Sequence, residues 1–363
     1  MPGSGTAPRW LPLLLLLYLA MLPPTAAGAS PALPPLPCDI LRDAGTPCVA
    51  AHSTTRALYA NYSGPLYEVR RSSDKHRLDV RPLFAGGPAN ASRQEVFCAG
   101  VLTSCVILRI YDQSPNQNHL ATAPPGQAIP LPDRGCNAAK DKISVFGGTA
   151  GTAGRYPVPV YGARFEGLMG YRNDTTTGMA VGDQAESIFA VFSGTHYNNF
   201  CCFDYGNAET DNKNDHTGTM EALYFGNAKG RLNHGGAGKG PWIMGDLESG
   251  LWGADVVESN ETAIRHAFVT AVLKGDSGPA PGHWALKGGD AQQGNLAVFW
   301  DGARPSGYAP MKKQGAIILG IGGDNSALGV GTFYEGCIVK GYTTAATDED
   351  VQRSIVDAGY RLP

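Results

Sequence analysis

The chain has 363 residues, of which 43% are hydrophobic and only 17% are charged, and its formal net charge at pH 7 is −3. A net charge this close to zero and slightly negative gives no reason to expect nucleic acid or an anionic membrane surface as a partner. The length allows one large domain or two small ones.

The N-terminal segment has the three parts of a secretory signal peptide. Arg9 precedes the apolar run 10–22, and a small-residue cleavage site ends at Ala29. The run is short and flanked by proline, which disfavours a membrane anchor, and no later segment is long and apolar enough to span a bilayer. We therefore predict a signal peptide over 1–29, a secreted and soluble protein, and a Pro-rich extended linker over 30–37.

Short apolar runs bounded by turn residues follow from Cys38 onward, and they are rich in β-branched and aromatic residues, as β-strands are. The clearest are 106–111, 187–192, 268–273, 296–300 and 316–321. Helical periodicity is limited to 54–62, which predicts one or two turns, and 348–358, which predicts a short C-terminal helix. Because the strands do not alternate with helices and no repeat or linker divides the chain, we predict one all-β domain over 38–363, an antiparallel β-sandwich of jelly-roll type.

Eight cysteines in a secreted chain are expected to form disulfides. Two pairs have a spacing that permits a local bridge: Cys38 with Cys48, and Cys98 with Cys105. Cys201 and Cys202 are adjacent, and a separate partner for each is favoured, because disulfide geometry prefers well-separated Cα atoms. Cys136 and Cys337 can pair with each other or remain two free thiols.

Four N-x-S/T sequons fit a secreted protein with a glycosylated surface. Each motif is weak by itself, so only some of them need be modified. The candidate glycosylation sites are Asn61, Asn90, Asn173 and Asn260.

Two segments place carboxylates where chemistry could occur. The segment 240–248 alternates as a strand does, so Asp246 and Glu248 are expected on one face. Buried carboxylates are costly unless paired or functional, so this pair either opens onto a cleft or is solvated at an exposed strand end, and the segment alone favours the solvated alternative. In the glycine-rich segment 320–325, the backbone can approach a ligand closely beside Asp324, although an ordinary Asp-Asn turn is the alternative.

Other kinds of site are disfavoured. The glycine-rich segment continues into a strand-like run and not into a helix, which argues against a dinucleotide-binding loop. The sequence shows no His or Cys cluster at metal-ligand spacing, no nucleophile elbow and no phosphate-binding loop. We therefore expect neither a metal nor a cofactor.

The chain contains long sequence blocks in a fixed order from Cys38 to about Val356. In these blocks it resembles the catalytic domain of glycoside hydrolase family 54, the fungal α-L-arabinofuranosidase B type, and matches this long are highly specific. The blocks are TPCVAAHSTTRALY (46–59), IYDQS (110–114), NHL (118–120), APPG (123–126), GTHYN (194–198), CCFDYGNAET (201–210), GPWIM (240–244), GAIILGIGGDNS (315–326) and GTFYEG (331–336).

This resemblance implies a two-layer β-sandwich and a retaining mechanism with Glu248 as nucleophile and Asp324 as acid/base. It also implies that Asp246 and the backbone at Gly323 bind the arabinofuranose ring. A retaining enzyme holds its two carboxyls about 5–5.5 Å apart, and the acid must carry a proton when substrate binds, which a negative Glu248 nearby would favour. The implied substrates are terminal α-L-arabinofuranosyl residues of arabinan, arabinoxylan or arabinogalactan, and the implied enzyme is a secreted, exo-acting monomer.

The resemblance also implies three disulfides. It reverses the preference stated above for Cys201 and Cys202, which match a vicinal disulfide that forms an apolar platform against the sugar. The other implied bridges are Cys38–Cys48 and Cys98–Cys105.

The chain departs from the family pattern at several points. Ser249 stands where the family usually has Asn, so one sugar contact is expected to differ, and the loop 231–236 stands where a Trp is usual. Cys136 and Cys337 have no counterpart in the pattern. The sequence ends at Pro363 without the family's arabinose-binding β-trefoil, so weaker tethering to a polymer is expected.

Two other functions remain as alternatives. One is a non-catalytic carbohydrate-binding β-sandwich, against which the presence of both Glu248 and Asp324 argues, because a binder has no need of that pair. The other is a related β-sandwich hydrolase for another glycan, such as a galactofuranoside or a β-glucan.

Overall fold

The computed structural model describes residue 5 and residues 34–148, 155–229, 233–254, 261–278 and 281–363. Apart from residue 5, the predicted signal peptide lies outside the described residues, as do residues 30–33 of the predicted linker and the sequon at Asn260. Residues 34–363 form one compact unit.

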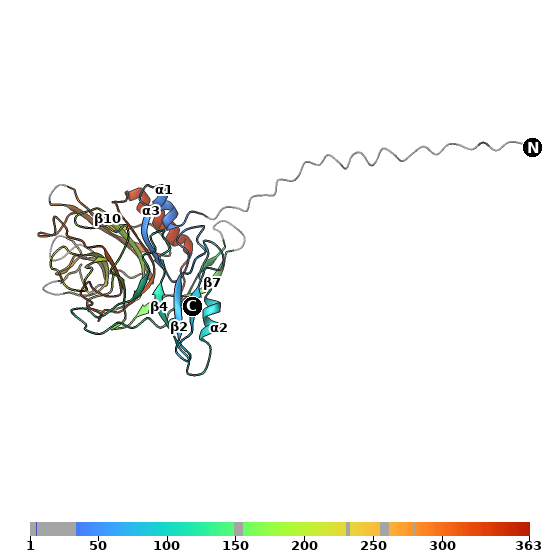
Figure 1. The fold of residues 1–363 in the computed structure, drawn as a ribbon. Helices are drawn as coiled ribbons and strands as arrows, with labels where there is room; N and C mark the ends of the chain where they lie inside the picture. The colour runs from blue at the N-terminus through green and yellow to red at the C-terminus, as the bar shows by residue number, and fades with distance from the viewer. Residues whose placement is uncertain (1–4, 6–33, 149–154, 230–232, 255–260, 279–280) are drawn as a thin grey trace, which may run out of the picture. The chain divides into compact units, whose positions relative to one another are not determined.

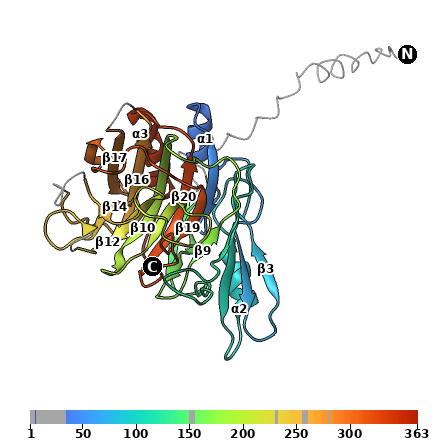
Figure 2. The same cartoon turned by 60° about the vertical axis from the view of Figure 1, so that its left-hand side comes forward.

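The core of this unit is built from two β-sheets, whose strands overlap all five of the apolar runs predicted from the sequence (Figure 2). Within the described residues, the smaller sheet has seven strands. In spatial order they are β1 (Cys48–Ser53), β20 (Gly331–Val339), β10 (Glu186–Tyr197), β16 (Phe268–Asp276), β17 (His283–Asp290) and β18 (Ala297–Ala303), with β8 (Ala163–Phe165) also paired to β20.

The larger sheet has eleven strands in the described part of the chain. In spatial order they are β13 (Asn233–His234), β15 (Leu251–Trp252), β14 (Trp242–Asp246), β12 (Glu221–Gly226), β11 (Asp204–Ala208), β19 (Ala316–Leu319), β9 (Tyr171–Asn173), β5 (Leu120–Thr122), β4 (Cys105–Ile110), β2 (Tyr67–Arg71) and β3 (Arg77–Val80). A separate hairpin is formed by β6 (Lys142–Gly147) and β7 (Tyr156–Tyr161).

Aromatic side chains fill the space between the two large sheets. The ring of Phe192, on β10, lies 5.3 Å from that of Phe203 and 5.9 Å from that of Phe225, on β12. Tyr205, on β11, lies 5.1 Å from Phe333, on β20. These rings are buried in the main hydrophobic core, and such pairs stabilise a core beyond the area that they bury. The predicted all-β sandwich is therefore confirmed.

The C-terminal helix is present and is longer than predicted. It is α3 (Ala345–Ala358), which begins where the Thr344 side chain accepts a hydrogen bond from the Thr347 amide. It ends at Gly359, which has the left-handed conformation typical of a helix C-terminus (φ 65°). Val351 and Ile355, on its predicted apolar face, are buried.

The helical turns predicted over 54–62 are wrong. Backbone amides there bond to side chains and not to the carbonyl four residues earlier: Arg56 N–H donates to Ser53 Oγ, and Leu58 N–H donates to Gln113 Oε1. Two short helices were not predicted, α1 (Pro37–Asp43) and α2 (Ala91–Cys98). Because Pro37 begins α1, as proline often does, the predicted linker includes one residue too many.

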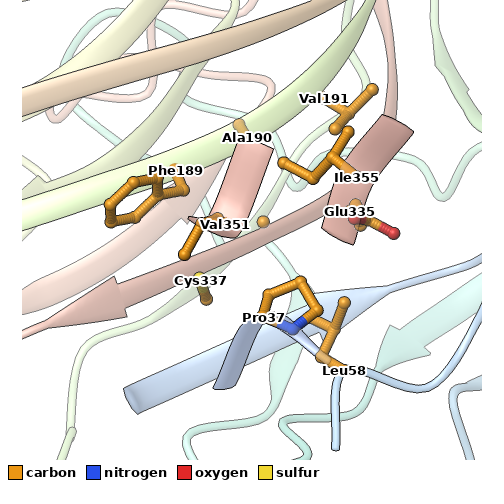
Figure 3. Close-up of a pocket in the computed structure, with 10 residues that line it drawn as sticks. Pro37, Leu58, Phe189, Ala190, Val191, Glu335, Cys337, Val351 and Ile355 are labelled. Atoms are coloured by element: carbon orange, nitrogen blue, oxygen red, sulfur yellow. The ribbon is translucent and has the colours of Figure 1, made fainter. Parts of the chain in front are cut away.

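Helices α1 and α3 lie side by side (Figure 1), and residues of both line one small cavity together with residues of strands β10 and β20 of the smaller sheet. Figure 3 shows the small cavity between them, where Pro37 and Val351 face Phe189 and Cys337. Its volume is about 10 Å³ and its lining is mostly apolar, so it is barely large enough for one water molecule. It belongs to the core and is too small to be a ligand site.

The cysteines pair as the resemblance implied. Disulfides join Cys38 to Cys48, Cys98 to Cys105, and Cys201 to Cys202. The alternative left open for the other two cysteines is also decided, since Cys136 and Cys337 are free thiols and both are buried. Among the residues described, no helix is long and apolar enough to cross a membrane.

Candidate active site

The site lies on the outer face of the larger sheet, where four adjacent strands place a carboxylate in a row with Ala222, Gly206 and Ile318. Asp246 on β14 pairs with Ala222 on β12, Ala222 pairs with Gly206 on β11, and Gly206 pairs with Ile318 on β19. Paired residues in antiparallel strands direct their side chains to the same face. A Cβ at Gly206 would lie 2.6 Å from the Ala222 Cα, so only glycine allows this close packing beside Asp246.

A cavity of 180 Å³ opens at the Asp246 end of this row. It gathers every residue predicted from the sequence for catalysis or sugar binding. These are Cys201, Cys202, Asp246, Glu248, Ser249, Gly323 and Asp324. The lining also includes residues that the sequence did not single out: Asn214, Asn233, Gly250, Leu251, Gly322 and Ser326.

Glu248 is held by a turn and not by a strand. Strand β14 ends at Asp246, and Glu248 and Ser249 both have left-handed backbone conformations (φ 67° and 62°). The Glu248 amide donates to Asp246 Oδ1 at 3.1 Å, and its carbonyl accepts from the Tyr308 hydroxyl at 2.7 Å. The predicted alternation therefore holds to Asp246 and fails at Glu248, because the chain turns two residues earlier than expected.

Both carboxylates of this segment are buried. Asp246 is 5% exposed and Glu248 is 7% exposed, and both line the cavity. The alternative of a solvated strand end, which the segment alone favoured, is therefore wrong.

Asp324 enters the cavity from the glycine-rich loop that follows β19. Its Oδ1 accepts hydrogen bonds from the Ser326 amide at 2.9 Å and the Ser326 hydroxyl at 2.6 Å. The carbonyl of Gly323 accepts a 2.9 Å hydrogen bond from Arg172 Nη1, on the buried strand β9. The same guanidinium donates to the Glu209 carbonyl at 2.6 Å, so it fixes the glycine loop to the end of β11.

The Cys201–Cys202 disulfide forms one wall of the cavity. Asp246 Oδ2 lies 3.8 Å from Cys201 Sγ and 3.4 Å from Cys202 Sγ. Cys202 is buried and Cys201 is half-buried, so the disulfide presents a partly accessible apolar surface beside a carboxylate. That combination suits a sugar ring, which has both apolar C–H faces and hydroxyl groups.

The carboxyl groups of the site strongly affect one another. Burial, followed by the negative charges of Asp246, Glu209 and Asp324, raises the pKa of Glu248 to about 10. Burial raises the pKa of Asp246 to about 7, against the lowering effect of the hydrogen bond from the Glu248 amide. These groups therefore share protons at neutral pH, as coupled carboxyls do.

Sequence reasoning missed several residues that support the site. Asp204 and Glu209 lie in the block CCFDYGNAET but were not singled out, although Asp204 lies two residues before Gly206 and therefore on the same face. That alternation could have identified Asp204. Arg172 and Tyr308 carried no usable signal, because they come from distant segments and only the fold brings them here.

The site offers a poor ligand set for a metal. The carboxylates of Asp204 and Asp246 and the sulfurs of Cys201 and Cys202 lie within 4.8 Å of one another. The two sulfurs are bonded to each other, however, and a metal requires thiolates. Two carboxylates remain, which is fewer ligands than a protein usually supplies to a structural or catalytic zinc ion.

Two larger hollows lie elsewhere on the described surface, but neither contains a pair of carboxylates. One, of 500 Å³, is lined by Asp290 as its single carboxylate, together with Arg265 and His266. The other, of 580 Å³, has Arg42 and Tyr62 among its lining residues and is lined by no carboxylate. Acid–base chemistry on a glycoside requires two carboxyl groups, so the cavity at Glu248 and Asp324 is the candidate active site.

The fold and this cavity define a class of β-sandwich proteins with a carboxylate-lined pocket on the outer face of one sheet. The family described as "Alpha-L-arabinofuranosidase B, catalytic" matches residues 37–361. The chain therefore belongs to the family of α-L-arabinofuranosidase B catalytic domains, as its sequence blocks predicted.

Relatives and solved structures agree with this membership. The chain is 49% identical over 328 residues to a probable α-L-arabinofuranosidase B of Aspergillus fumigatus, which covers 89% of this chain and 62% of the relative. It is 50% identical over 330 residues to an arabinofuranosidase/B-xylosidase of Trichoderma koningii, covering 90% and 63%. A crystal structure of an arabinofuranosidase complexed with arabinofuranosyl-alpha-1,2-xylobiose aligns with a TM-score of 0.82 at 46% identity, covering 90% of this chain and 66% of that one. The chain thus spans a little under two thirds of the length of these proteins.

Proposed function

We propose that this chain is a retaining, exo-acting α-L-arabinofuranosidase with Glu248 as nucleophile and Asp324 as acid/base. The observation that carries the proposal is the single 180 Å³ cavity lined by both carboxyls, by Asp246 and by the Cys201–Cys202 disulfide. A cavity of this size suits one terminal pentose residue and not the interior of a polymer chain, which favours exo action.

The chemistry proceeds by double displacement. Asp324 donates a proton to the departing glycosidic oxygen while a Glu248 carboxylate oxygen attacks the anomeric carbon, which gives an arabinosyl ester of Glu248. Asp324, now ionised, takes a proton from a water molecule that attacks the anomeric carbon and releases Glu248. The hydrogen bonds from Ser326 hold the Asp324 carboxyl in one orientation during both steps.

Sugar binding is assigned to the remaining lining residues. Asp246 accepts hydrogen bonds from ring hydroxyls, and the backbone at Gly323 and the side chain of Ser249 supply further polar contacts. The Cys201–Cys202 disulfide packs against an apolar face of the ring. Ser249 is exposed at the mouth of the cavity, so its shorter side chain leaves more room there than an Asn would.

The nucleophile must be ionised, which the raised pKa of Glu248, about 10, opposes. Glu248 ionises more easily when neighbouring carboxyls hold the protons of the cluster. Glu209 is hydrogen-bonded to the Glu248 side chain and also accepts from the Thr219 hydroxyl at 2.5 Å. Burial raises the pKa of Glu209, although its hydrogen bonds with Thr219 and Glu248 act to lower it. We propose that the proton of the pair moves from Glu248 to Glu209 when substrate binds, which leaves Glu248 ionised.

The wider assignments follow from the sequence. We propose a secreted monomer whose signal peptide ends near Ala29 and whose substrates are arabinose-containing polysaccharides and oligosaccharides. Among the described sequons, Asn61 is exposed, whereas the side-chain amide of Asn173 donates to the His119 carbonyl at 3.1 Å and the side chain of Asn90 accepts from Ser92. Asn61 is therefore the described sequon best placed for a glycan.

The purified protein tests the proposal with aryl glycosides. Release of 4-nitrophenol from 4-nitrophenyl α-L-arabinofuranoside, with little release from the β-D-galactofuranoside and the β-D-xylopyranoside, is the expected result. Proton NMR of the first-formed arabinose should show the α-anomer, as retention requires. Absence of turnover together with measurable arabinose binding would instead favour a carbohydrate-binding module.

A further inference from the structure

Asp204 is a carboxyl group that the mechanism above does not use. It is the first residue of β11 and is 0% exposed. It lies beneath the cavity, and its carboxylate is within 4.8 Å of Asp246 and of both sulfurs of the vicinal disulfide. It does not line the cavity, so it cannot contact the sugar directly.

Among the described residues, no cation is a main influence on the pKa of Asp204. Its side chain is hydrogen-bonded to that of Asp246, and neither of its oxygens has another partner among the described residues. The charged groups that raise its pKa are acidic: Asp246 on β14, Glu248 from the turn after β14, and Asp324 from the loop after β19. From β12 it pairs with Tyr224, whose hydroxyl donates to the Phe200 carbonyl.

An ionised carboxylate in this position would be buried beside other carboxylates without a donor. Such a group is very costly, and it neutralises by keeping its proton. A neutral Asp204 has one O–H to donate, and Asp246 is the acceptor to which it is bonded. Burial indeed raises the pKa of Asp204 well above its usual range.

We propose that Asp204 is a positioning residue that stays protonated and donates a hydrogen bond to Asp246, which keeps Asp246 ionised and oriented toward the sugar hydroxyls. This inference rests on the proposed function of the cavity. Asp246 also accepts the amide hydrogen of Glu248, so Asp204 acts on a carboxylate that is connected to the nucleophile's backbone.

The proposal predicts different effects for two replacements of Asp204 that are similar in size. Asp204→Asn keeps a hydrogen-bond donor, whereas Asp204→Leu keeps the volume and removes the donor. With 4-nitrophenyl α-L-arabinofuranoside, we expect kcat and KM of Asp204→Asn to stay within about threefold of wild type. For Asp204→Leu we expect KM and the arabinose inhibition constant to rise by about tenfold, as loss of one buried hydrogen bond predicts, with a smaller change in kcat. Asp141→Asn, at a half-buried carboxyl away from the cavity, is the matched control and should change neither constant.

A spectroscopic measurement tests the protonation independently of activity. Infrared difference spectra at neutral pH should show the carbonyl stretch of a protonated carboxylic acid in wild type that is missing from Asp204→Asn. Absence of that band would overturn the proposal. Equal increases of KM and of the arabinose inhibition constant in the folded Asn and Leu variants would also overturn it, as would wild-type constants in both variants. If wild type fails to hydrolyse the arabinofuranoside, the proposed function fails, while the infrared result still decides whether Asp204 holds a proton.

Discussion

The Tyr308 hydroxyl donates a 2.7 Å hydrogen bond to the backbone carbonyl of Glu248. Glu248 needs this support because its left-handed backbone (φ 67°) is unfavourable for a residue with a side chain. Tyr308 is fixed in turn by Trp252, whose Nε1 donates to its hydroxyl at 3.1 Å, and the Trp252 ring stacks on His234 at 3.9 Å. Three aromatic side chains, His234, Trp252 and Tyr308, therefore connect strands β13 and β15 to the backbone of the proposed nucleophile.

Replacing Tyr308 by Phe should impair catalysis more than folding. Loss of one buried hydrogen bond costs about 1 kcal/mol, and if that free energy is lost from nucleophile alignment, kcat/KM falls roughly five- to tenfold. Steady-state kinetics and the melting temperature measure the two effects separately. Tyr161→Phe, which removes a similar bond to Glu95 away from the site, is the control and should leave kcat/KM unchanged. A full loss of folding in Tyr308→Phe, or unchanged kinetics, contradicts the assignment.

The acid/base role of Asp324 predicts a dependence on the leaving group. Asp324→Asn should lose far more activity on a natural oligosaccharide than on an activated aryl arabinofuranoside, because only the poor leaving group needs protonation. Added azide should partly restore turnover of the aryl substrate, since azide attacks the arabinosyl-enzyme without a base. Equal losses on both substrates, without rescue, would argue that Asp324 has another role.

Gly323 is predicted to tolerate no side chain. A Cβ at this position would overlap Glu209 Oε2, so Gly323→Ala should displace either the Glu209 carboxyl or the loop that carries Asp324. We expect kcat/KM to fall by at least about tenfold, given how strongly misplaced catalytic groups reduce rates. Gly167→Ala is the control, because the nearest atom to its added Cβ is 3.8 Å away. Kinetics that do not distinguish the two variants would show that the close packing against Glu209 is unimportant.

The carboxyl cluster predicts an unusual dependence of stability on pH. Because the folded-state pKa of Glu248, about 10, lies above its ordinary value of 4.5, the folded state binds more protons than the unfolded state between these values. The free energy of unfolding of the substrate-free protein therefore falls as pH rises through that window, and Asp246 contributes the same sign between 3.8 and about 7. Denaturant unfolding at pH 5, 6.5 and 8 should show a shallower decline for Glu248→Gln than for wild type. Identical slopes would show that Glu248 is already ionised in the empty site.

The vicinal disulfide is predicted to act in binding. Replacing Cys201 and Cys202 together by Ser removes the apolar wall and should weaken arabinose inhibition while the fold persists, since the pair links only adjacent residues. The same double replacement at Cys98 and Cys105, whose bridge closes a remote loop, should leave arabinose inhibition unchanged. Inhibition constants and melting temperatures of both variants decide the matter, and an unaltered constant in the first variant would refute the platform.

The sequence predicts the strands well because their pattern is local. Apolar runs such as 268–273 become β16, and the periodicity over 348–358 becomes α3, since each pattern repeats along one element. Prediction from the sequence fails where contacts with distant residues determine the backbone conformation. At Leu58, for example, the amide donates to Gln113 and is not part of a helix. Of the site, alternation alone predicts the face on which Asp246 lies but not its burial, and the burial of Glu248 depends on a turn held by Tyr308, sixty residues away.

The roles of Glu248 and Asp324 are the central claim, and the raised pKa of Glu248 makes a direct assignment of the nucleophile necessary. An arabinofuranose-configured cyclic sulfate is opened by a nucleophilic carboxylate, which leaves a stable ester on the attacking residue. The proposed mechanism predicts that, after labelling and proteolysis, mass spectrometry finds the ester on the peptide that contains Glu248, and that Glu248→Gln is not labelled. An ester on Asp324 in the wild-type protein would contradict the account and exchange the two roles.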